Sequence, residues 1–302
     1  MKQKVVIIGH GAIGGAIKSL LKIKPNITIN LWDIDGRRVK KKLPLIKTVP
    51  QADFLFLCIP SRSVPPVLDT IAPMINKKTV VIAVAKGIER QSKKFIDQFL
   101  ASRLGQKQPI ALLYGPMLAT ELKRHQGGVG VVAAKKITTG RRIGGLFSQT
   151  TLATEYSTDL RGVAVVGVLK NIYALILGIA DGLNWGKNKK GWLITQSIRE
   201  MTRLVKKLGG KEQTVLGFAG LGDLITTGFS TDSRNSQVGR LLAESPYCPL
   251  SCEGCISLPI IVKLAGRERK KLILLKALFE VSESKHQASV VFKKVFNQTN
   301  HQ

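Results

Sequence analysis

An apolar run over residues 163–182 carries a lysine and an asparagine at its centre, Lys170 and Asn171. A lysine ammonium loses hydration in such a segment, which costs free energy unless a partner or a substrate compensates for the loss. Lysines in apolar surroundings recur as catalytic groups, because their pKa shifts readily. Taken alone, the run allows three interpretations: a catalytic lysine, a core helix whose lysine reaches water along its stem, and a helix that crosses a membrane. The motifs in the rest of the chain favour the catalytic lysine, and no transmembrane segment is expected.

A glycine motif near the N-terminus indicates a second kind of chemistry. The β-rich residues 4–8 are followed by Gly9, Gly11 and Gly14 in the pattern G-x-G-x-x-G, and the amphipathic stretch 16–21 comes next. Between a strand and a helix, Gly9 permits a tight turn, Gly11 lets the backbone approach a pyrophosphate, and Gly14 allows close helix–strand packing. The helix N-terminus offers its N–H groups to the phosphates. The residues predicted to bind a dinucleotide here are Gly9, Gly11, Ala12, Ile13 and Gly14.

An aspartate indicates which dinucleotide is bound. Asp33 ends the next strand-like segment, residues 27–33, at the distance from the glycines that a dinucleotide fold requires. Its carboxylate can accept hydrogen bonds from the ribose hydroxyls of the adenosine and would repel a 2′-phosphate. Arg37 and Arg38 follow closely and keep NADP possible. NAD is therefore the expected cofactor, with NADP as the alternative.

The order of the remaining segments predicts two domains of different class. Strand-like runs recur at 54–59, 79–84, 109–113, 128–134 and 152–156. Alternation of such runs with helix or turn segments is typical of a doubly wound sheet. From residue 162 onward the periodicity is helical, with helices expected at 192–208, 232–244, 256–265 and 270–281. We expect an α/β Rossmann-type domain over 1–158, an all-α substrate and catalytic domain over 159–283, and a polar, loosely packed tail over 284–302.

The charge of the chain is strongly positive, with 47 Lys and Arg against 19 Asp and Glu and a net charge of +28. Such a field attracts polyanions. The basic residues are scattered in short clusters without the interleaved aromatic residues that a single-strand-binding groove uses, so no specific nucleic-acid partner is expected. The first residues run directly into an apolar strand and glycines, without a secretory signal, which favours the cytoplasm.

Three of the four cysteines lie close together, as Cys248, Cys252 and Cys255. This C-x3-C-x2-C spacing could hold an iron–sulfur cluster, but nothing else in the sequence suggests the surrounding fold. Disulfides are rare in the cytosol. Free thiols and no bound metal are therefore the favoured interpretation.

Several further blocks occur in a characteristic order along the chain. They are Lys86-Gly-Ile-Glu89, Gly115-Pro116 with Glu121, Leu169-Lys170-Asn171, Gly220-Leu-Gly-Asp223-Leu224, Ser233-Arg234-Asn235 and Glu253-Gly254. In this order and near this spacing they resemble the NAD(P)-dependent glycerol-3-phosphate dehydrogenase family. The resemblance covers most of the chain. It implies hydride transfer from NAD(P)H to dihydroxyacetone phosphate, which gives sn-glycerol 3-phosphate for phospholipid synthesis.

The resemblance also assigns roles to individual residues. Hydride that arrives at a carbonyl carbon pushes negative charge onto the oxygen, so a proton donor is needed there. By resemblance the donor is Lys170, and Asp223 orients it or balances its charge. The polar cluster would be completed by Asn171, Lys86 and Thr227. The implied cofactor contacts are Lys86, Ala119, Arg234 and Glu253. The implied substrate contacts are Lys86, Gly115, Lys170, Asp223, Ser233, Arg234 and Asn235, and the expected assembly is a homodimer.

Two other functions stay open beside this one. They are a related 3-hydroxyacid or ketopantoate-type dehydrogenase, and a divergent, inactive protein that binds a cofactor or a polyanion. Met117 stands where the family has a hydroxyl residue, and the segment 36–51 is shorter than the family's. The joint presence of Lys170, Asp223 and Arg234 argues against a binding module, because such a protein needs no proton donor.

Overall fold

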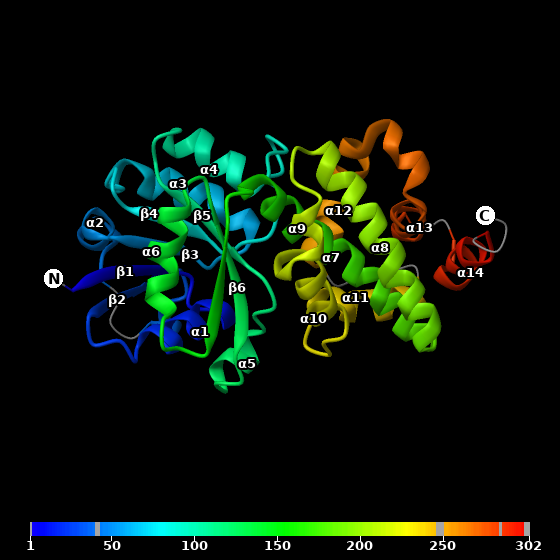
Figure 1. Ribbon diagram of the computed structural model, residues 1–302, viewed down its shortest axis with the longest axis horizontal. Helices are drawn as coiled ribbons and strands as arrows, with labels where there is room; N and C mark the ends of the chain where they lie inside the picture. The colour runs from blue at the N-terminus through cyan, green and yellow to red at the C-terminus, as the bar shows by residue number, and fades with distance from the viewer. Residues whose placement is uncertain (1, 40–42, 246–250, 284–285, 299–302) are drawn as a thin grey trace. The chain divides into compact units, whose positions relative to one another are not determined.

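A computed structural model describes residues 2–39, 43–245, 251–283 and 286–298. Contacts between residues divide the chain into two compact units, Met1–Ala164 and Val165–Gln302. The first unit contains the sheet, and the described residues of the second unit form helices and turns (Figure 1). The predicted fold class, a Rossmann-type α/β sheet followed by a helical region, is confirmed.

The sheet of the first unit has seven strands in the order β2-β1-β3-β4-β5-β6-β7. They are β1 (Gln3–Ile8), β2 (Ile27–Trp32), β3 (Phe54–Leu57), β4 (Val80–Ala83), β5 (Ile110–Tyr114), β6 (Gly128–Ala134) and β7 (Leu152–Ser157). Neighbouring strands are parallel, except that β5 and β6 run antiparallel. The central strands read as continuous apolar runs, because parallel strands covered on both faces have no polar side. Consequently β1, β3, β4 and β5 all end at one edge of the sheet.

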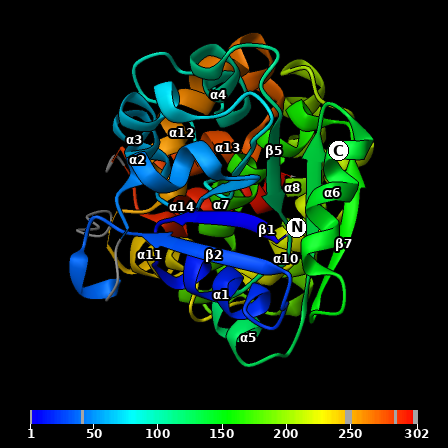
Figure 2. The same cartoon turned by 90° about the vertical axis from the view of Figure 1, so that its left-hand side faces the viewer.

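Helices cover both faces of this sheet. They are α1 (Ala12–Leu21), α2 (Leu45–Thr48), α3 (Val64–Ile71), α4 (Ile96–Leu104), α5 (Ala119–Lys123) and α6 (Ile137–Phe147). Figure 2 shows α2, α3 and α4 on one side of β1 and β2, with α1 and α5 on the other. The apolar face of α1 is buried through residues such as Ile17 and Leu21, which pack into the same core as Phe56 of β3.

The second unit is built around α7 (Leu160–Gly182), whose first turn belongs to the first unit. The other helices are α8 (Lys187–Lys207), α9 (Gln213–Leu216), α10 (Asp223–Gly228), α11 (Arg234–Glu244), α12 (Glu253–Ala265), α13 (Ile273–Ser282) and α14 (Ala288–Gln298). By length and composition α7 could cross a membrane, with a mean hydropathy of 2.1, but its apolar window is completely buried inside the protein. The core-helix interpretation of this run therefore accounts for its composition.

Glycines bring α7 and α11 unusually close together. A Cβ on Gly178 would lie 2.3 Å from the Ser236 carbonyl oxygen, and one on Gly239 would lie 2.1 Å from the Leu175 carbonyl oxygen. Only glycine permits backbones to approach so closely. The crossing fixes the start of α11, which carries Asn235, against the middle of α7.

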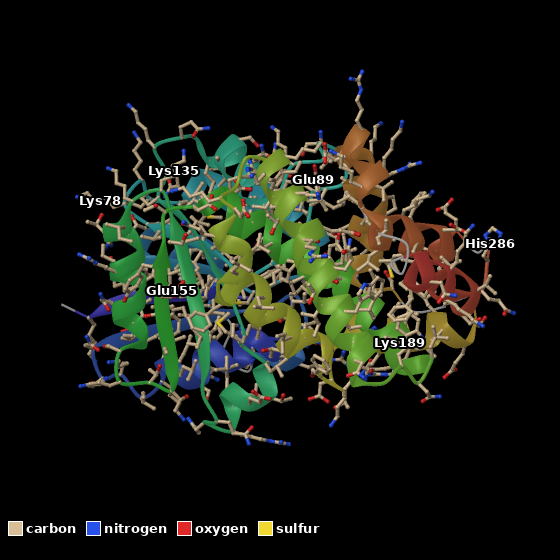
Figure 3. The ribbon with its side chains drawn as sticks, turned by 45° about the vertical axis from the view of Figure 1, so that its right-hand side comes forward. Lys78, Glu89, Lys135, Glu155, Lys189 and His286 are labelled. Carbon is tan, nitrogen blue, oxygen red and sulfur yellow. The ribbon has the colours of Figure 1, made fainter. Side chains whose placement is uncertain are left out.

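The C-terminal stretch differs from the expected polar tail, because residues 288–298 form α14. Val291, Phe292 and Val295 are nearly wholly buried. Phe296 stacks edge-on with Trp192 of α8, at 5.1 Å between ring centres. The ammonium of Lys189, labelled in Figure 3, lies 5.1 Å from the centre of the Phe296 ring. The stretch looked unpatterned because only a few apolar residues, at helical spacing, form its contact face.

A buried ion pair holds the start of α7 to α4. Arg161 Nη1 lies 3.0 Å from Asp97 Oδ1, and Asp97 is only 7% exposed. Burial raises the pKa of Asp97 to about 6, although the Arg161 guanidinium opposes the shift. In the unfolded chain an aspartate has a pKa of about 3.9. At a pH between these two values, Asp97 is protonated in the folded protein and ionised in the unfolded chain. The free energy of unfolding therefore falls as the pH rises through this range.

Asparagine cannot ionise, so we expect the free energy of unfolding of Asp97→Asn not to fall with pH in this way. Relative to wild type, its free energy of unfolding rises by about 3 kcal/mol between pH 4 and pH 7, because a pKa difference of about two corresponds to that amount. Urea denaturation at intervals of one pH unit measures the difference. Asp69→Asn is the matched control, since Asp69 pairs with Arg103 at a site where its side chain is 55% exposed. Parallel pH curves for Asp97→Asn and wild type would contradict the prediction.

Candidate active site

The glycine turn lies at the edge of the sheet where the parallel strands end. Gly9 follows β1 with a φ of +95°, and a Cβ there would lie 2.5 Å from the Cys58 carbonyl oxygen. Gly11 precedes α1 and has open space, with only an Arg38 nitrogen within 4 Å of a Cβ position, at 3.6 Å. No side chain caps α1 at this end. The turn and its helix N-terminus thus suit the pyrophosphate of a dinucleotide.

The Asp33 carboxylate accepts two hydrogen bonds from backbone N–H groups near the glycine turn. Asp33 is 6% exposed, and its Oδ2 accepts the His10 N–H at 2.7 Å while its Oδ1 accepts the Asp35 N–H at 2.9 Å. The carboxylate therefore ties the glycine turn to the end of β2. The sequence indicated only a ribose contact for this residue, because the two backbone partners become visible only in the folded turn.

Arg38 lies beside the same turn. Its Nε is 3.5 Å from Asp35 Oδ2, and its carbonyl oxygen is 2.8 Å from His10 Nδ1. The Arg38 side chain is 53% exposed, so its guanidinium can reach a ligand. Hydrogen bonds from the Arg37 side chain and backbone, together with the charge of Arg38, lower the pKa of Asp35. A cation is thus held next to Gly11, where a dinucleotide would lie.

Three more of the proposed contacts follow the ends of β4 and β5. Lys86 is half-buried, with its ammonium 5.3 Å from the centre of the Tyr114 ring. Gly115 has a φ of +136°, and a Cβ there would lie 2.4 Å from the Val129 carbonyl oxygen. Ala119 begins α5. Met117 is partly buried against the core of this unit.

The second unit contains a buried cluster around Lys170. This residue is 6% exposed, and its Nζ donates to Thr227 Oγ1 at 2.7 Å and lies 3.1 Å from Asp223 Oδ1. The Thr227 hydroxyl donates in turn to Asp223 Oδ1, at 3.1 Å. A carboxylate therefore balances the ammonium in a site with little water. Such a lysine can give a proton to a developing alkoxide and can take one back.

Local structure explains why Asp223 and Thr227 meet Lys170 together. The glycine-rich residues Phe218–Gly222 form a π-helical turn that leads directly into α10. Asp223 and Thr227 are four residues apart on α10, so they share one face of the helix. Ser236 of α11 donates to the Thr227 carbonyl oxygen at 2.8 Å and holds this helix in place. Sequence reasoning missed Ser236, because a single serine in a helix gives no signal of its own.

A second polar group joins α7, α11 and α12. Asn235 Nδ2 donates to Asn171 Oδ1 at 3.0 Å, and Asn235 Oδ1 accepts the Gly254 N–H at 3.0 Å. Ser233 caps α11 through its hydroxyl, which accepts the Ser236 N–H. The side-chain amides of Asn171 and Asn235 thus lie together, and Asn171 directly follows Lys170 in the sequence.

Arg234 and Glu253 lie at the first turns of their helices. Arg234 is exposed, and its Nε donates to the Ser251 carbonyl oxygen at 3.4 Å. Its position at the N-terminus of α11 places a guanidinium beside helix N–H groups, which together suit a phosphate. Glu253 is half-buried at the first turn of α12.

Sequence reasoning gave no role to Glu200, which supports the Lys170 helix. Glu200 is completely buried on α8 and accepts the Tyr173 hydroxyl at 2.9 Å. It also accepts the N–H groups of Leu274 and Leu275, at 2.8 and 3.1 Å, at the start of α13. Burial raises the pKa of Glu200 in spite of these bonds. The residue fixes α7 through Tyr173, one helical turn beyond Lys170.

Within the described residues no group of three or more His, Cys, Asp and Glu side chains could hold a metal ion. Cys248 lies outside those residues, and Cys252 and Cys255 are present as thiols that no disulfide joins. The side chains of the second unit thus offer acid–base and anion-binding groups, and those of the first unit offer a dinucleotide turn.

Two family models match most of the chain. Residues 36–139 match the NAD-dependent glycerol-3-phosphate dehydrogenase N-terminus, and residues 159–293 match the C-terminus of the same family. The chain is 32% identical to a glycerol-3-phosphate dehydrogenase (NAD(P)+) from Tropheryma whipplei, over 95% of this chain and 91% of that protein. Its relative from Fusobacterium nucleatum, of the same name, is 33% identical over 80% of this chain and 78% of that protein.

A solved structure shows the same fold over the whole length. The glycerol-3-phosphate dehydrogenase from Coxiella burnetii superimposes with a TM-score of 0.87 and 25% identity. The superposition covers 98% of this chain and 99% of that one. The similarity therefore extends over the sheet and the helices that carry the lysine cluster.

Proposed function

The chain belongs to the NAD-dependent glycerol-3-phosphate dehydrogenase family, and we propose that it reversibly reduces dihydroxyacetone phosphate to sn-glycerol 3-phosphate with Lys170 as the proton donor. The Lys170–Asp223–Thr227 cluster is the single observation that supports this role best. A binding module has no need of a buried ammonium held between a hydroxyl and a carboxylate. The expected cofactors, NADH or NADPH, supply the hydride when bound.

The chain's own residues handle the proton and the developing charge. In the direction of reduction, Lys170 gives a proton from Nζ to the carbonyl oxygen of the substrate, and in the reverse direction Nζ takes it back. Asp223 stabilises the ammonium form before transfer, and the Thr227 hydroxyl fixes the direction of Nζ. Asn171 and Asn235, whose amides are already joined, are suited to the substrate hydroxyl. Low exposure of the cluster strengthens each of these polar interactions.

We assign the substrate phosphate to Arg234. Its exposed guanidinium can form charge-assisted bonds with a phosphate, and the α11 N–H groups behind Ser233 face the same region. Lys86 and Gly115 remain proposed substrate contacts of the first unit. Gly9, Gly11, Ala12, Ile13, Gly14, Ala119 and Glu253 remain proposed cofactor contacts.

A substrate panel tests the function. The purified protein should oxidise NADH or NADPH with dihydroxyacetone phosphate, and should be nearly inactive with unphosphorylated dihydroxyacetone and with ketopantoate. Turnover of ketopantoate without turnover of dihydroxyacetone phosphate would instead establish the ketopantoate-type alternative. Salt-sensitive binding of nucleic acid with no turnover of any ketone would establish the polyanion-binding alternative.

The position of Arg38 leads to a prediction about cofactor preference. Because Asp33 is bonded internally and Arg38 lies beside Gly11, we expect the enzyme to use NADPH as well as NADH. Arg38→Ala should raise KM for NADPH about tenfold, the effect of losing about 1.4 kcal/mol of binding energy. KM for NADH should change less than about twofold, because NADH has no 2′-phosphate.

Arg37→Ala is the matched control for Arg38→Ala. The Arg37 side chain is 92% exposed and bonded to Asp35, so its removal should leave both KM values nearly unchanged. Equal effects of Arg38→Ala on the two cofactors would contradict the assignment, as would NADPH being no substrate of the wild-type enzyme.

We also propose where the enzyme works and how it assembles. We place the enzyme in the cytoplasm as a homodimer that supplies glycerol 3-phosphate for phospholipid synthesis. Light scattering on the purified protein measures the assembly directly, and a monomeric mass would overturn the dimer.

A further inference from the structure

Two cysteines lie at the first turn of α12 in a C-x-x-C arrangement. Cys252 is the N-cap residue of this 13-residue helix, and its Sγ accepts the Cys255 N–H at 3.4 Å. The two sulfur atoms are 3.2 Å apart. A sulfur that caps a helix N-terminus meets partial positive charge from the free N–H groups, which stabilises a thiolate.

The two thiols differ from Cys58 of the first unit in reactivity. The interaction with Cys255 and backbone hydrogen bonds lower the pKa of Cys252, against the opposing effect of burial. Burial alone raises the pKa of Cys58 far above its ordinary value, so that thiol stays protonated and inert. Cys252 is 5% exposed and Cys255 is partly exposed. An incoming reagent therefore reaches Cys255, with Cys252 directly behind it.

The geometry is close to that of a disulfide. A disulfide bond is about 2.05 Å long, so the sulfurs must approach each other by about 1 Å to form one. A small movement of the first helical turn can supply this approach. The bond is reversible, because a thiol can attack it and reduce it again by the same exchange.

The segment between the cysteines contacts the Lys170 region. Gly254 donates its N–H to Asn235 Oδ1, and a Cβ on Gly254 would lie 2.6 Å from the Asn171 carbonyl oxygen. Only glycine fits at position 254, because a side chain there would collide with the backbone of Asn171. A shift of the first turn of α12 therefore moves Asn235 and the backbone of Asn171, the neighbour of Lys170.

We propose that Cys252 and Cys255 are a reversible dithiol–disulfide site, which reacts with disulfides of small thiols or of proteins and lowers the dehydrogenase activity when oxidised. The effect on activity rests on the proposed function, whereas the bond between the two sulfurs does not. Cytosolic disulfides are mostly transient and redox-sensing, which this site fits.

The reaction is a thiol–disulfide exchange, and it needs only the two cysteines and one disulfide, RSSR. The Cys252 thiolate takes the proton of the adjacent Cys255 thiol, and the Cys255 sulfur attacks a disulfide RSSR. The attack breaks the S–S bond of RSSR, forms a mixed disulfide with Cys255 and releases one RS⁻, which takes up that proton from Cys252. The Cys252 thiolate then attacks the Cys255 sulfur, forms the Cys252–Cys255 bond and expels the second RS⁻. Two protein thiols are oxidised, RSSR is reduced to two thiols, and the protons of the protein thiols end on the two RS⁻ ions.

The test uses the full-length enzyme with oxidised glutathione as the probe. Peptide mapping should find a Cys252–Cys255 bond, and activity should fall about fivefold or more, the scale of a typical coupling between sites. Dithiothreitol should restore the activity. Cys255→Ser should form no such bond and keep its activity under the same treatment, while Cys58→Ala and Cys248→Ser should respond like wild type.

The possible results distinguish a failure of the proposed Cys252–Cys255 site from a failure of the proposed dehydrogenase function. A bond that joins Cys248 to either partner, or no bond at all, would overturn the proposal. A Cys252–Cys255 bond with unchanged activity would overturn its regulatory part. If the reduced enzyme turns over no ketone, the proposed function fails, and peptide mapping together with dinucleotide affinity of the two redox forms still decides the site.

Discussion

Lys170→Met lowers kcat for dihydroxyacetone phosphate by about 10²–10⁴-fold, the usual contribution of a positioned acid or base, and leaves the affinity for NADH nearly unchanged. The reason is the geometry of the cluster, in which the Lys170 ammonium is the acid and is held next to Thr227 and Asp223. Methionine keeps the length and apolar character of the stem without the ammonium. Steady-state kinetics and NADH fluorescence titration measure the two effects.

Two further variants make this result interpretable. Lys170→Met leaves the Asp223 carboxylate buried without its cation, which can destabilise a protein by about 3–5 kcal/mol. Lys170→Met/Asp223→Asn removes that charge as well, and should be stable and equally inactive. Lys206→Met makes the same replacement at an α8 side chain that is 64% exposed, and should keep full activity. A kcat of the stable double variant within about tenfold of wild type would show that another group donates the proton.

The second large effect is expected at Arg234. Arg234→Ala should raise KM for dihydroxyacetone phosphate about 10- to 100-fold, because a charge-assisted hydrogen bond contributes about 1.5–3 kcal/mol. kcat should fall much less, since the guanidinium binds the phosphate equally well in the ground state and in the transition state. Initial rates over a range of substrate concentrations separate the two constants.

The matched control is an exposed arginine on another helix of the same unit. Arg199→Ala on α8 removes a guanidinium at an exposed position and should leave KM unchanged. Arg234→Lys should restore part of the affinity, because lysine keeps the charge without the bidentate geometry. An unaltered KM in Arg234→Ala would place the phosphate elsewhere.

The parts that sequence could predict are those with local causes. The glycine turn follows from Gly9 and Gly11 between a strand and a helix, and the structure gives Gly9 its positive φ. The strands follow from short apolar runs, which parallel pairing on both sides requires. The order of motifs indicated that Lys170 and Asp223 belong to one site, and in the structure they form an ion pair.

The parts that sequence could not predict depend on contacts between distant segments. Ser236 and Glu200 support the site through partners that lie far away in the sequence, such as Thr227 and Leu274. The two backbone bonds of Asp33 exist only once β1 and β2 lie side by side. Likewise α14 was missed, since its apolar stripe becomes recognisable only against the Trp192 ring of α8.

Transfer of label from the cofactor tests the proposed reaction most directly. With NADH that carries deuterium at both C4 positions, the wild-type enzyme should convert dihydroxyacetone phosphate to glycerol 3-phosphate with one deuterium on its central carbon. The double variant Lys170→Met/Asp223→Asn should form almost no labelled product in the same time while it still binds NADH. Unlabelled product from the wild-type enzyme, or equal labelling by the double variant, would contradict hydride transfer assisted by Lys170.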